Sequence, residues 1–173
     1  MYYEEIESLN DLVGDRGLLR LPAYLSEVFI FDEDRARAVE MAVKLLIEGQ
    51  NVLIEGRAGV GKTALVFMVI KRLLGIRPVG YIKDGVSSIG REHEKRGMIL
   101  FYDDIPRMNP DALRSIVKNN VRGIIATARV EEVSLIRERL GINIYDYFES
   151  IRVTLMSREK LREMLLKLSL IHI

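Results

Sequence analysis

The sequence predicts an α/β domain in which a parallel sheet of five strands is covered by helices on both faces. Two observations support this. Short apolar runs alternate along the chain with segments whose apolar residues recur at helical spacing, as in repeated strand–helix–strand units with right-handed crossovers. Several of these runs are apolar throughout, as in strands buried on both faces. With 173 residues, the chain is long enough for one such domain with a sizeable core.

The first half of the chain contains two of the expected strands. Residues 1–31 show no clear periodicity, and we expect an irregular lead-in that wraps the core or docks near the ligand. A helix is expected over 32–48, with an aspartate as its N-cap. A strand over 52–54 precedes a glycine-rich loop and a helix that ends near residue 74. A second strand follows over 79–82.

The second half continues the alternation after a polar, glycine-spaced segment over 83–97. The expected elements are, in order, a buried strand over 98–102, a helix over 110–118, a strand over 123–127, a helix over 131–140, a fifth strand over 151–155 and an amphipathic helix from 157 to the end. Asn109 and Pro110 are typical of the N-cap and first position of a helix.

The loop after the first strand has the composition of a phosphate-binding loop. Its residues are Gly56, Arg57, Ala58, Gly59, Val60, Gly61, Lys62, Thr63 and Ala64. The glycines let successive backbone N–H groups turn inward toward a polyphosphate, and the helix that begins at Gly61 adds its dipole. Lys62 would contact the β- and γ-phosphates, and the Thr63 hydroxyl would ligate Mg²⁺. The motif predicts a nucleoside-triphosphate site.

Polar residues also follow two other predicted strands. Asp103 and Asp104 come after the third strand, and Thr127 and Arg129 close the fourth. Because ligands of parallel sheets bind beyond the carboxyl ends of the strands, we expect these residues to share one site with the loop. Asp103 would hold Mg²⁺ through water, and Asp104 would orient or deprotonate an attacking water.

These segments resemble AAA+ ATPases, with the helicase and clamp-loader clade the nearest. The similar stretches are 51–63 (Walker A), 99–110 (Walker B and the next helix start), 123–127 (the sensor-1 strand) and 148–161 (the fifth strand leading into a lid). The resemblance implies a P-loop NTPase three-layer sandwich that hydrolyses ATP at the β–γ bond with Mg²⁺, and it places Thr127 near the γ-phosphate. It divides the chain into a lead-in (1–31), an ATPase core (32–156) and the start of a lid (157–173).

The sequence departs from the family pattern at three places. Asp104 stands where a glutamate is usual. Tyr147 occupies the position where many AAA+ proteins have an arginine finger, and Arg137 and Arg139 are the nearest substitutes. The lid is represented by one helix, so we expect either a minimal protein or a part of a larger one. We also expect either a homo-oligomer or a partner that supplies a finger and a lid.

Two other functions fit parts of the pattern. The Asp-Asp pair and the Thr127-Ala-Arg129 element also resemble STAND ATPases, in which Arg129 rather than Thr127 would contact the γ-phosphate. Such a protein would be a nucleotide-binding switch or adaptor with little or no hydrolysis. A small-molecule P-loop kinase is less favoured, because it needs an arginine-rich lid over an acceptor pocket and residues 83–97 are only a faint candidate.

The amino-acid composition excludes or disfavours several kinds of site and several classes of protein. The absence of cysteine excludes disulfides and thiolate metal sites and favours the cytoplasm. A net charge of +1 gives no support to a broadly basic nucleic-acid surface, and no apolar run is long enough for a membrane helix. His93 lies in a mixed-charge run without partners at metal-binding spacing, which favours a solvated surface.

Overall fold

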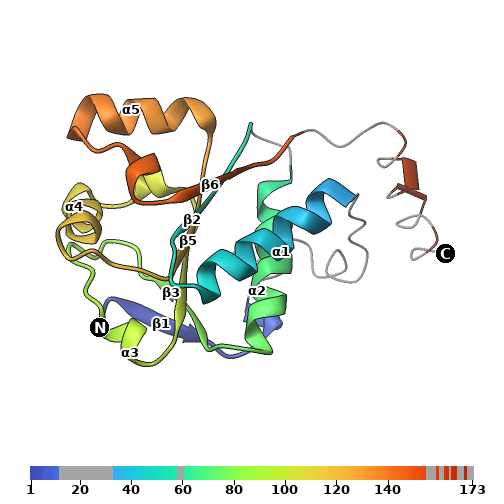
Figure 1. The fold of residues 1–173 in the computed structure, drawn as a ribbon, viewed down its shortest axis with the longest axis horizontal. Coiled ribbons are helices and arrows are strands. Elements are labelled where there is room, and N and C mark those ends of the chain that lie inside the picture. The colour runs from blue at the N-terminus through green and yellow to red at the C-terminus, as the bar shows by residue number, and fades with distance from the viewer. Residues whose placement is uncertain are drawn as a thin grey trace.

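The computed structural model describes residues 1–11, 33–57 and 61–154, together with isolated helical positions between 159 and 170. The described part forms a six-stranded sheet in the order β1-β3-β4-β5-β2-β6, flanked by helices (Figure 1). The strands are β1 (Tyr3–Ile6), β2 (Val52–Glu55), β3 (Val79–Ile82), β4 (Ile99–Tyr102), β5 (Ile124–Ala128) and β6 (Glu149–Arg152). The helices are α1 (Glu33–Ile47), α2 (Lys62–Leu74), α3 (Glu92–Lys95), α4 (Pro110–Lys118) and α5 (Val130–Leu140). The predicted α/β architecture is confirmed.

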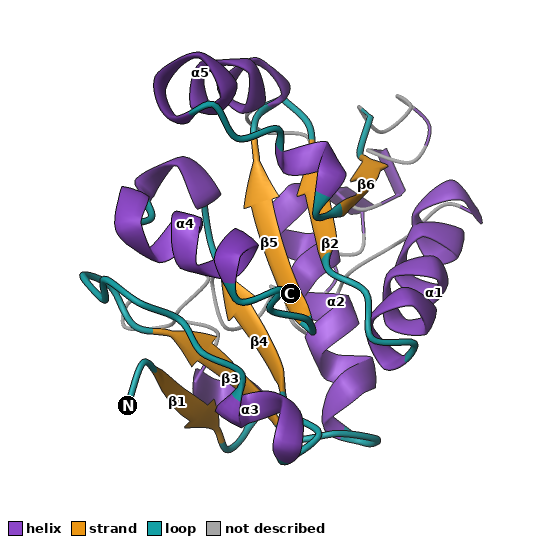
Figure 2. Cartoon of the chain, turned by 60° about the vertical axis from the view of Figure 1, so that its left-hand side comes forward, coloured by secondary structure: helices purple, strands orange, loops and turns teal. Residues whose placement is uncertain are grey.

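The sheet separates two apolar cores. Helices α1 and α2 cover one face, and α4 and α5 cover the other (Figure 2). Along β2, Val52 and Ile54 pack into the first core while Leu53 packs into the second, and every residue of β2, β4 and β5 is buried. Burial on both faces explains why these strands are apolar throughout in the sequence.

The strand order places β5 between β2 and β4. In the parallel register, Ile54 of β2 lies beside Thr127 of β5, and Tyr102 of β4 lies beside Ala126. The loop after β2, the acidic pair after β4 and the end of β5 therefore come to one edge of the sheet. This arrangement, visible in Figure 2, creates the site described below.

The sheet has one strand more than predicted. Strand β1 pairs antiparallel with β3 at the edge of the sheet, with Tyr3 beside Ile82 and Ile6 beside Val79. The expectation of an irregular lead-in was wrong for these residues, because two consecutive glutamates between Tyr3 and Ile6 hide the alternation that marks a strand. The other lead-in residues, including the expected N-cap at position 32, lie outside the described part.

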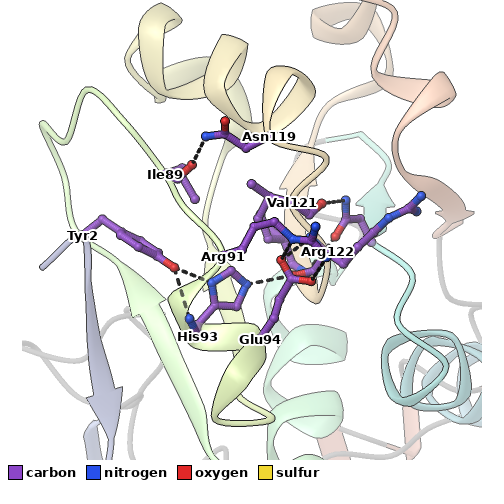
Figure 3. A network of polar contacts seen from close by, with 10 residues as sticks. Tyr2, Ile89, Arg91, His93, Glu94, Asn119, Val121 and Arg122 are labelled. Carbon is purple, nitrogen blue, oxygen red and sulfur yellow. Dashed lines mark hydrogen bonds and ion pairs between the residues drawn. The ribbon is translucent and has the colours of Figure 1, made fainter.

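The interpretation of His93 as a solvated residue was also wrong. The polar segment over 83–97 contains the short helix α3, and the His93 side chain is fully buried. The Tyr2 hydroxyl lies 2.5 Å from Nδ1, and Nε2 lies 2.8 Å from the Arg122 carbonyl oxygen (Figure 3). Burial lowers the pKa of His93 and raises that of Tyr2 to about 12, so a neutral imidazole and a neutral phenol link β1, α3 and the segment before β5.

The later elements differ from expectation only in their bounds. Strand β6 begins two residues earlier than predicted, at Glu149, and ends at Arg152. Residues 153 and 154 are described and lie outside the strand, and residue 155 lies outside the described part. Most of the expected helix from residue 157 also lies outside it. None of the described helices is long and apolar enough to cross a membrane.

The pairing of β1 with β3 depends on the small size of Gly80. A Cβ atom there would lie 2.7 Å from the Glu4 carbonyl oxygen and 2.9 Å from the Met98 sulfur. We therefore expect Gly80→Ala to lower the free energy of unfolding by roughly 1–3 kcal/mol, measured by urea denaturation. Gly75→Ala is the control, because its Cβ would meet nothing closer than 3.8 Å. Equal stability of the two variants would contradict the close approach.

Candidate functional site

The Thr127 hydroxyl connects the ends of β4 and β5. It donates a hydrogen bond of 2.7 Å to Asp103 Oδ1 and accepts one of 2.7 Å from the Asp104 backbone N–H. Thr127 is only 3% exposed, so these bonds lie away from bulk water. Thr127 thus fixes both acidic residues relative to β5.

Asp104 has an uncommon backbone conformation. Its φ of 65° and ψ of 76° lie in the left-handed region, and it caps a 3-10 turn over Ile105–Arg107. Aspartate tolerates this region better than most residues with a Cβ atom. Burial raises the pKa of the Asp104 carboxyl, and the negative charges of Glu132 and Asp103 raise it further. The carboxylate is therefore a stronger base than an ordinary surface aspartate.

The phosphate loop is described at both of its ends. Gly61 has a φ of 94° and caps α2, whose first turn contains Lys62, Thr63 and Ala64. The predicted loop residues Ala58, Gly59 and Val60 lie outside the described part. Strand β5 supports the beginning of the loop, because the Gly56 N–H lies 3.3 Å from the Ala128 carbonyl oxygen.

Lys62 lies across the loop and near the acidic strand ends. Its Nζ donates to the carbonyl oxygens of Gly56 at 2.8 Å and of Arg57 at 3.2 Å. Burial lowers the pKa of Lys62, and the positive charge of Arg129 lowers it further. The carboxylates of Glu132, Asp104 and Glu131 oppose this change. Lys62 therefore lies close enough to Asp104 and Arg129 for their charges to act on it.

Glu132 belongs to the site although the sequence analysis did not select it. Its Oε1 accepts hydrogen bonds from the Arg129 backbone N–H at 3.1 Å and from the Arg129 Nε at 3.0 Å. The bond to the backbone N–H caps the N-terminus of α5, and the bond to Nε holds the Arg129 side chain. The signal in the sequence was the glutamate three residues after Arg129, a spacing that marks helix starts and does not by itself indicate a ligand site.

A second carboxylate at the base of the loop was also missed. Glu55, the last residue of β2, is 2% exposed and accepts hydrogen bonds from the Tyr145 hydroxyl and the Ser150 hydroxyl, each at 2.6 Å. Arg152 forms an ion pair with it at 3.3 Å. These contacts fix β6 and the turn over Ile144–Asp146 against the residue that precedes the phosphate loop.

A groove of about 550 Å³ opens beside the loop. Its lining residues are Gly56, Arg57, Val130, Glu131, Ser134, Arg152, Val153 and Thr154. The groove therefore runs between the beginning of the loop, the first turn of α5 and the end of β6. It adjoins the candidate site and belongs to it.

The arginines considered as fingers do not lie beside Arg129 at the candidate site. Arg137 and Arg139 lie exposed in the last turn of α5, at the opposite end of the helix from Arg129. Tyr147 is partly buried after the turn over Ile144–Asp146, and its carbonyl oxygen accepts a hydrogen bond from Asn51. A finger function for either arginine stays a prediction.

The donor set fits Mg²⁺ held jointly with a nucleotide. Within the described residues, no three histidine, aspartate or glutamate side chains form a cluster that could hold a metal ion alone. Mg²⁺ sites in nucleotide-binding proteins use one or two protein oxygens and complete their shell with phosphate and water. The Asp103 carboxylate after β4 and the Thr63 hydroxyl in the first turn of α2 match that requirement.

Comparison with known proteins shows a shared fold. No protein-family model matches the sequence, and no curated protein matches it. The structure is similar to that of S. cerevisiae Hsp104 in an extended complex with casein, at 15% identity and a TM-score of 0.62, covering 99% of this chain and 34% of that one. It is similar to the closed state of Hsp104 with ATPγS and FITC casein, at 17% identity and a TM-score of 0.64, with coverages of 99% and 34%.

A third similar structure is the S. cerevisiae Hsp104–ADP complex, at 16% identity and a TM-score of 0.62, covering 99% of this chain and 28% of that one. At these identities the likeness shows that this chain shares the fold of the matched part of Hsp104. The chain spans about a third of the length of these proteins. The resemblance to the helicase and clamp-loader clade, and that to the STAND group, stay predictions.

The hydroxyl of Thr127 should matter for stability as well as for the site. Thr127→Val removes the acceptor of the Asp104 N–H, and an unsatisfied buried donor costs about 1–3 kcal/mol. We expect that loss in urea denaturation, whereas Thr127→Ser keeps the hydroxyl and most of the stability. A valine variant as stable as the serine variant would contradict the bridge between the two strands.

Proposed function

We propose that this chain is an ATPase core of AAA+ type that binds Mg-ATP and cleaves the β–γ bond. The observation that carries the proposal is the convergence of Lys62 of the phosphate loop, the Asp103–Thr127–Asp104 bridge and Arg129 at one edge of the sheet. The fold shared with Hsp104, whose structures include ATPγS and ADP, supports the choice of an adenine nucleotide.

In this proposal catalysis consists of positioning and charge neutralisation. The amides of the loop from Gly56 to Ala64 and the Lys62 ammonium would hold the phosphates. Thr63 and Asp103 would hold Mg²⁺, which when bound offsets phosphate charge. Asp104 would accept the proton of the attacking water, and Thr127 would hold both acidic residues in place near the γ-phosphate.

The environment of Asp104 suits a general base. A base must be deprotonated, and it accepts a proton more readily when its pKa is raised toward the working pH. Burial and the charges of Glu132 and Asp103 shift the pKa of Asp104 in that direction. Because aspartate is one methylene shorter than the glutamate usual in such enzymes, slow hydrolysis is expected.

A nucleotide-gated switch of STAND type is the second candidate, and the geometry of Arg129 favours it. Arg129 immediately follows β5 and influences the pKa values of both Lys62 and Asp104. An arginine of the same chain can therefore sense the γ-phosphate, without a finger from another subunit. Self-association separates the candidates: a motor would oligomerise with ATP and gain activity with concentration, whereas a switch would remain monomeric and nearly inert.

Lys62 should determine nucleotide affinity. Replacing it with alanine removes a charge-assisted contact to the phosphates worth about 1.5–3 kcal/mol, so Lys62→Ala should weaken Mg-ATP binding by at least about tenfold. Calorimetric titration measures this, and Lys71→Ala, on the exposed face of the same helix, is the control. Unchanged affinity in Lys62→Ala would contradict the assignment of the loop.

Asp104 should determine turnover rather than binding. Asp104→Asn keeps a side chain that tolerates the left-handed conformation but removes the base, so we expect turnover to fall by about 10²–10⁴-fold with ATP affinity retained. In the wild type, phosphate release should decline as the pH falls through the raised pKa of Asp104, because protonation removes the base. Turnover equal to wild type in Asp104→Asn would place the base elsewhere.

A further inference from the structure

We propose that Glu132 is a positioning residue that holds Arg129 for contact with the terminal phosphate of a bound nucleoside triphosphate. This inference rests on the proposed nucleotide site and deepens it. It adds to the site a residue outside the phosphate loop and the acidic pair, and it assigns discrimination between triphosphate and diphosphate to the Arg129–Glu132 pair.

The geometry of the pair leaves the phosphate-binding edge of the arginine open. A single carboxylate oxygen, Oε1, accepts from both the backbone N–H and the Nε of Arg129, at 3.1 and 3.0 Å. Within the part of the chain that the structure describes, the terminal nitrogens of Arg129 have no hydrogen-bond partner. Glu132 therefore restrains the guanidinium through its inner nitrogen, while the two nitrogens that bind phosphate most readily remain available.

The burial of the two side chains supports the same division of roles. The Glu132 side chain is 16% exposed, whereas that of Arg129 is 50% exposed. A carboxylate held in the protein is a fixed anchor, and a half-exposed guanidinium can reach a ligand. Because the guanidinium is half-exposed, the ion pair itself contributes little to stability, and we assign its value to orientation.

The Glu132 carboxylate lies at the proposed nucleotide site. Arg129 directly follows β5, whose last carbonyl oxygen lies 3.3 Å from the Gly56 N–H at the beginning of the phosphate loop. Helix α5, which carries Glu132, packs against the 3-10 turn that Asp104 caps. The pair therefore adjoins both the beginning of the loop and the turn that carries the proposed base. A triphosphate held by Lys62 would bring its terminal group toward the open edge of Arg129.

If Glu132 served only to cap α5, its replacement would have a different effect on nucleotide binding. Glu132 also completes the cap of α5, and a glutamine oxygen can accept the same bond from the Arg129 backbone N–H. Glu132→Gln therefore preserves the cap but removes the charge that orients the guanidinium. If capping were its whole role, this variant would bind every nucleotide as the wild type does.

The test measures the ratio of the affinities for Mg-ATPγS and Mg-ADP by calorimetry in four proteins: the wild type, Arg129→Gln, Glu132→Gln and the double variant. A charge-assisted contact to the terminal phosphate worth about 1.5–3 kcal/mol corresponds to a loss of about tenfold or more in this ratio for Arg129→Gln. Glu132→Gln should lower the ratio severalfold with ADP affinity little changed. The double variant should behave like Arg129→Gln alone.

A matched control is available on another helix. Arg91 and Glu94 form a pair with the same spacing, at 2.8 Å between Nε and Oε2, in the network of Figure 3. Glu94→Gln should leave the nucleotide ratio unchanged. If Glu132→Gln lowered the Mg-ATPγS to Mg-ADP affinity ratio equally in the wild type and in Arg129→Gln, the proposal would be overturned. An unchanged ratio in Glu132→Gln would overturn it as well. A wild type that binds neither nucleotide would overturn the proposed function and this inference together.

Discussion

One hydroxyl group joins the parts of the site. Thr127 donates to the Asp103 carboxylate and accepts from the Asp104 N–H, so its side chain fixes both acidic residues. This is possible because β5 lies between β2 and β4 in the sheet. The same strand supports the phosphate loop through the Ala128 carbonyl oxygen and leads directly into Arg129 and α5. The order of three buried strands thus brings residues from distant segments to one place.

The charges collected there are of both signs and partly buried. Lys62 and Arg129 face Asp104 and Glu132, and the pKa values of Lys62 and Asp104 shift in the directions that disfavour their charged forms. A phosphate group would stabilise the protonated lysine, and a nearby divalent cation would stabilise the aspartates. These charges suit the proposed ligand, a magnesium nucleotide, because it carries both a polyanion and a metal ion.

Local sequence patterns predicted most of the sheet and the helix after the phosphate loop, but not the contacts between distant segments. Strand β3 has the predicted bounds, and the run over 98–102 reads as a strand because both of its faces are buried. The burial of His93 could not be predicted, because its partners are 91 and 29 residues away in the chain. Glu132 was missed for a related reason: its spacing to Arg129 has the form of a helix cap, and only the strand order places that cap beside Lys62.

The most direct test of this account is the response of the Asp104 backbone amide to nucleotide, followed by NMR of ¹⁵N-labelled protein. If the Thr127 bridge lies at the terminal phosphate, Mg-ATPγS should shift the Asp104 and Thr127 amide signals, and Mg-ADP should shift them much less. Lys62 and its loop neighbours should respond to both nucleotides. Nucleotide-dependent shifts confined to other parts of the chain, with the Asp104 and Thr127 signals unmoved, would contradict the central claim that these strand ends form the site.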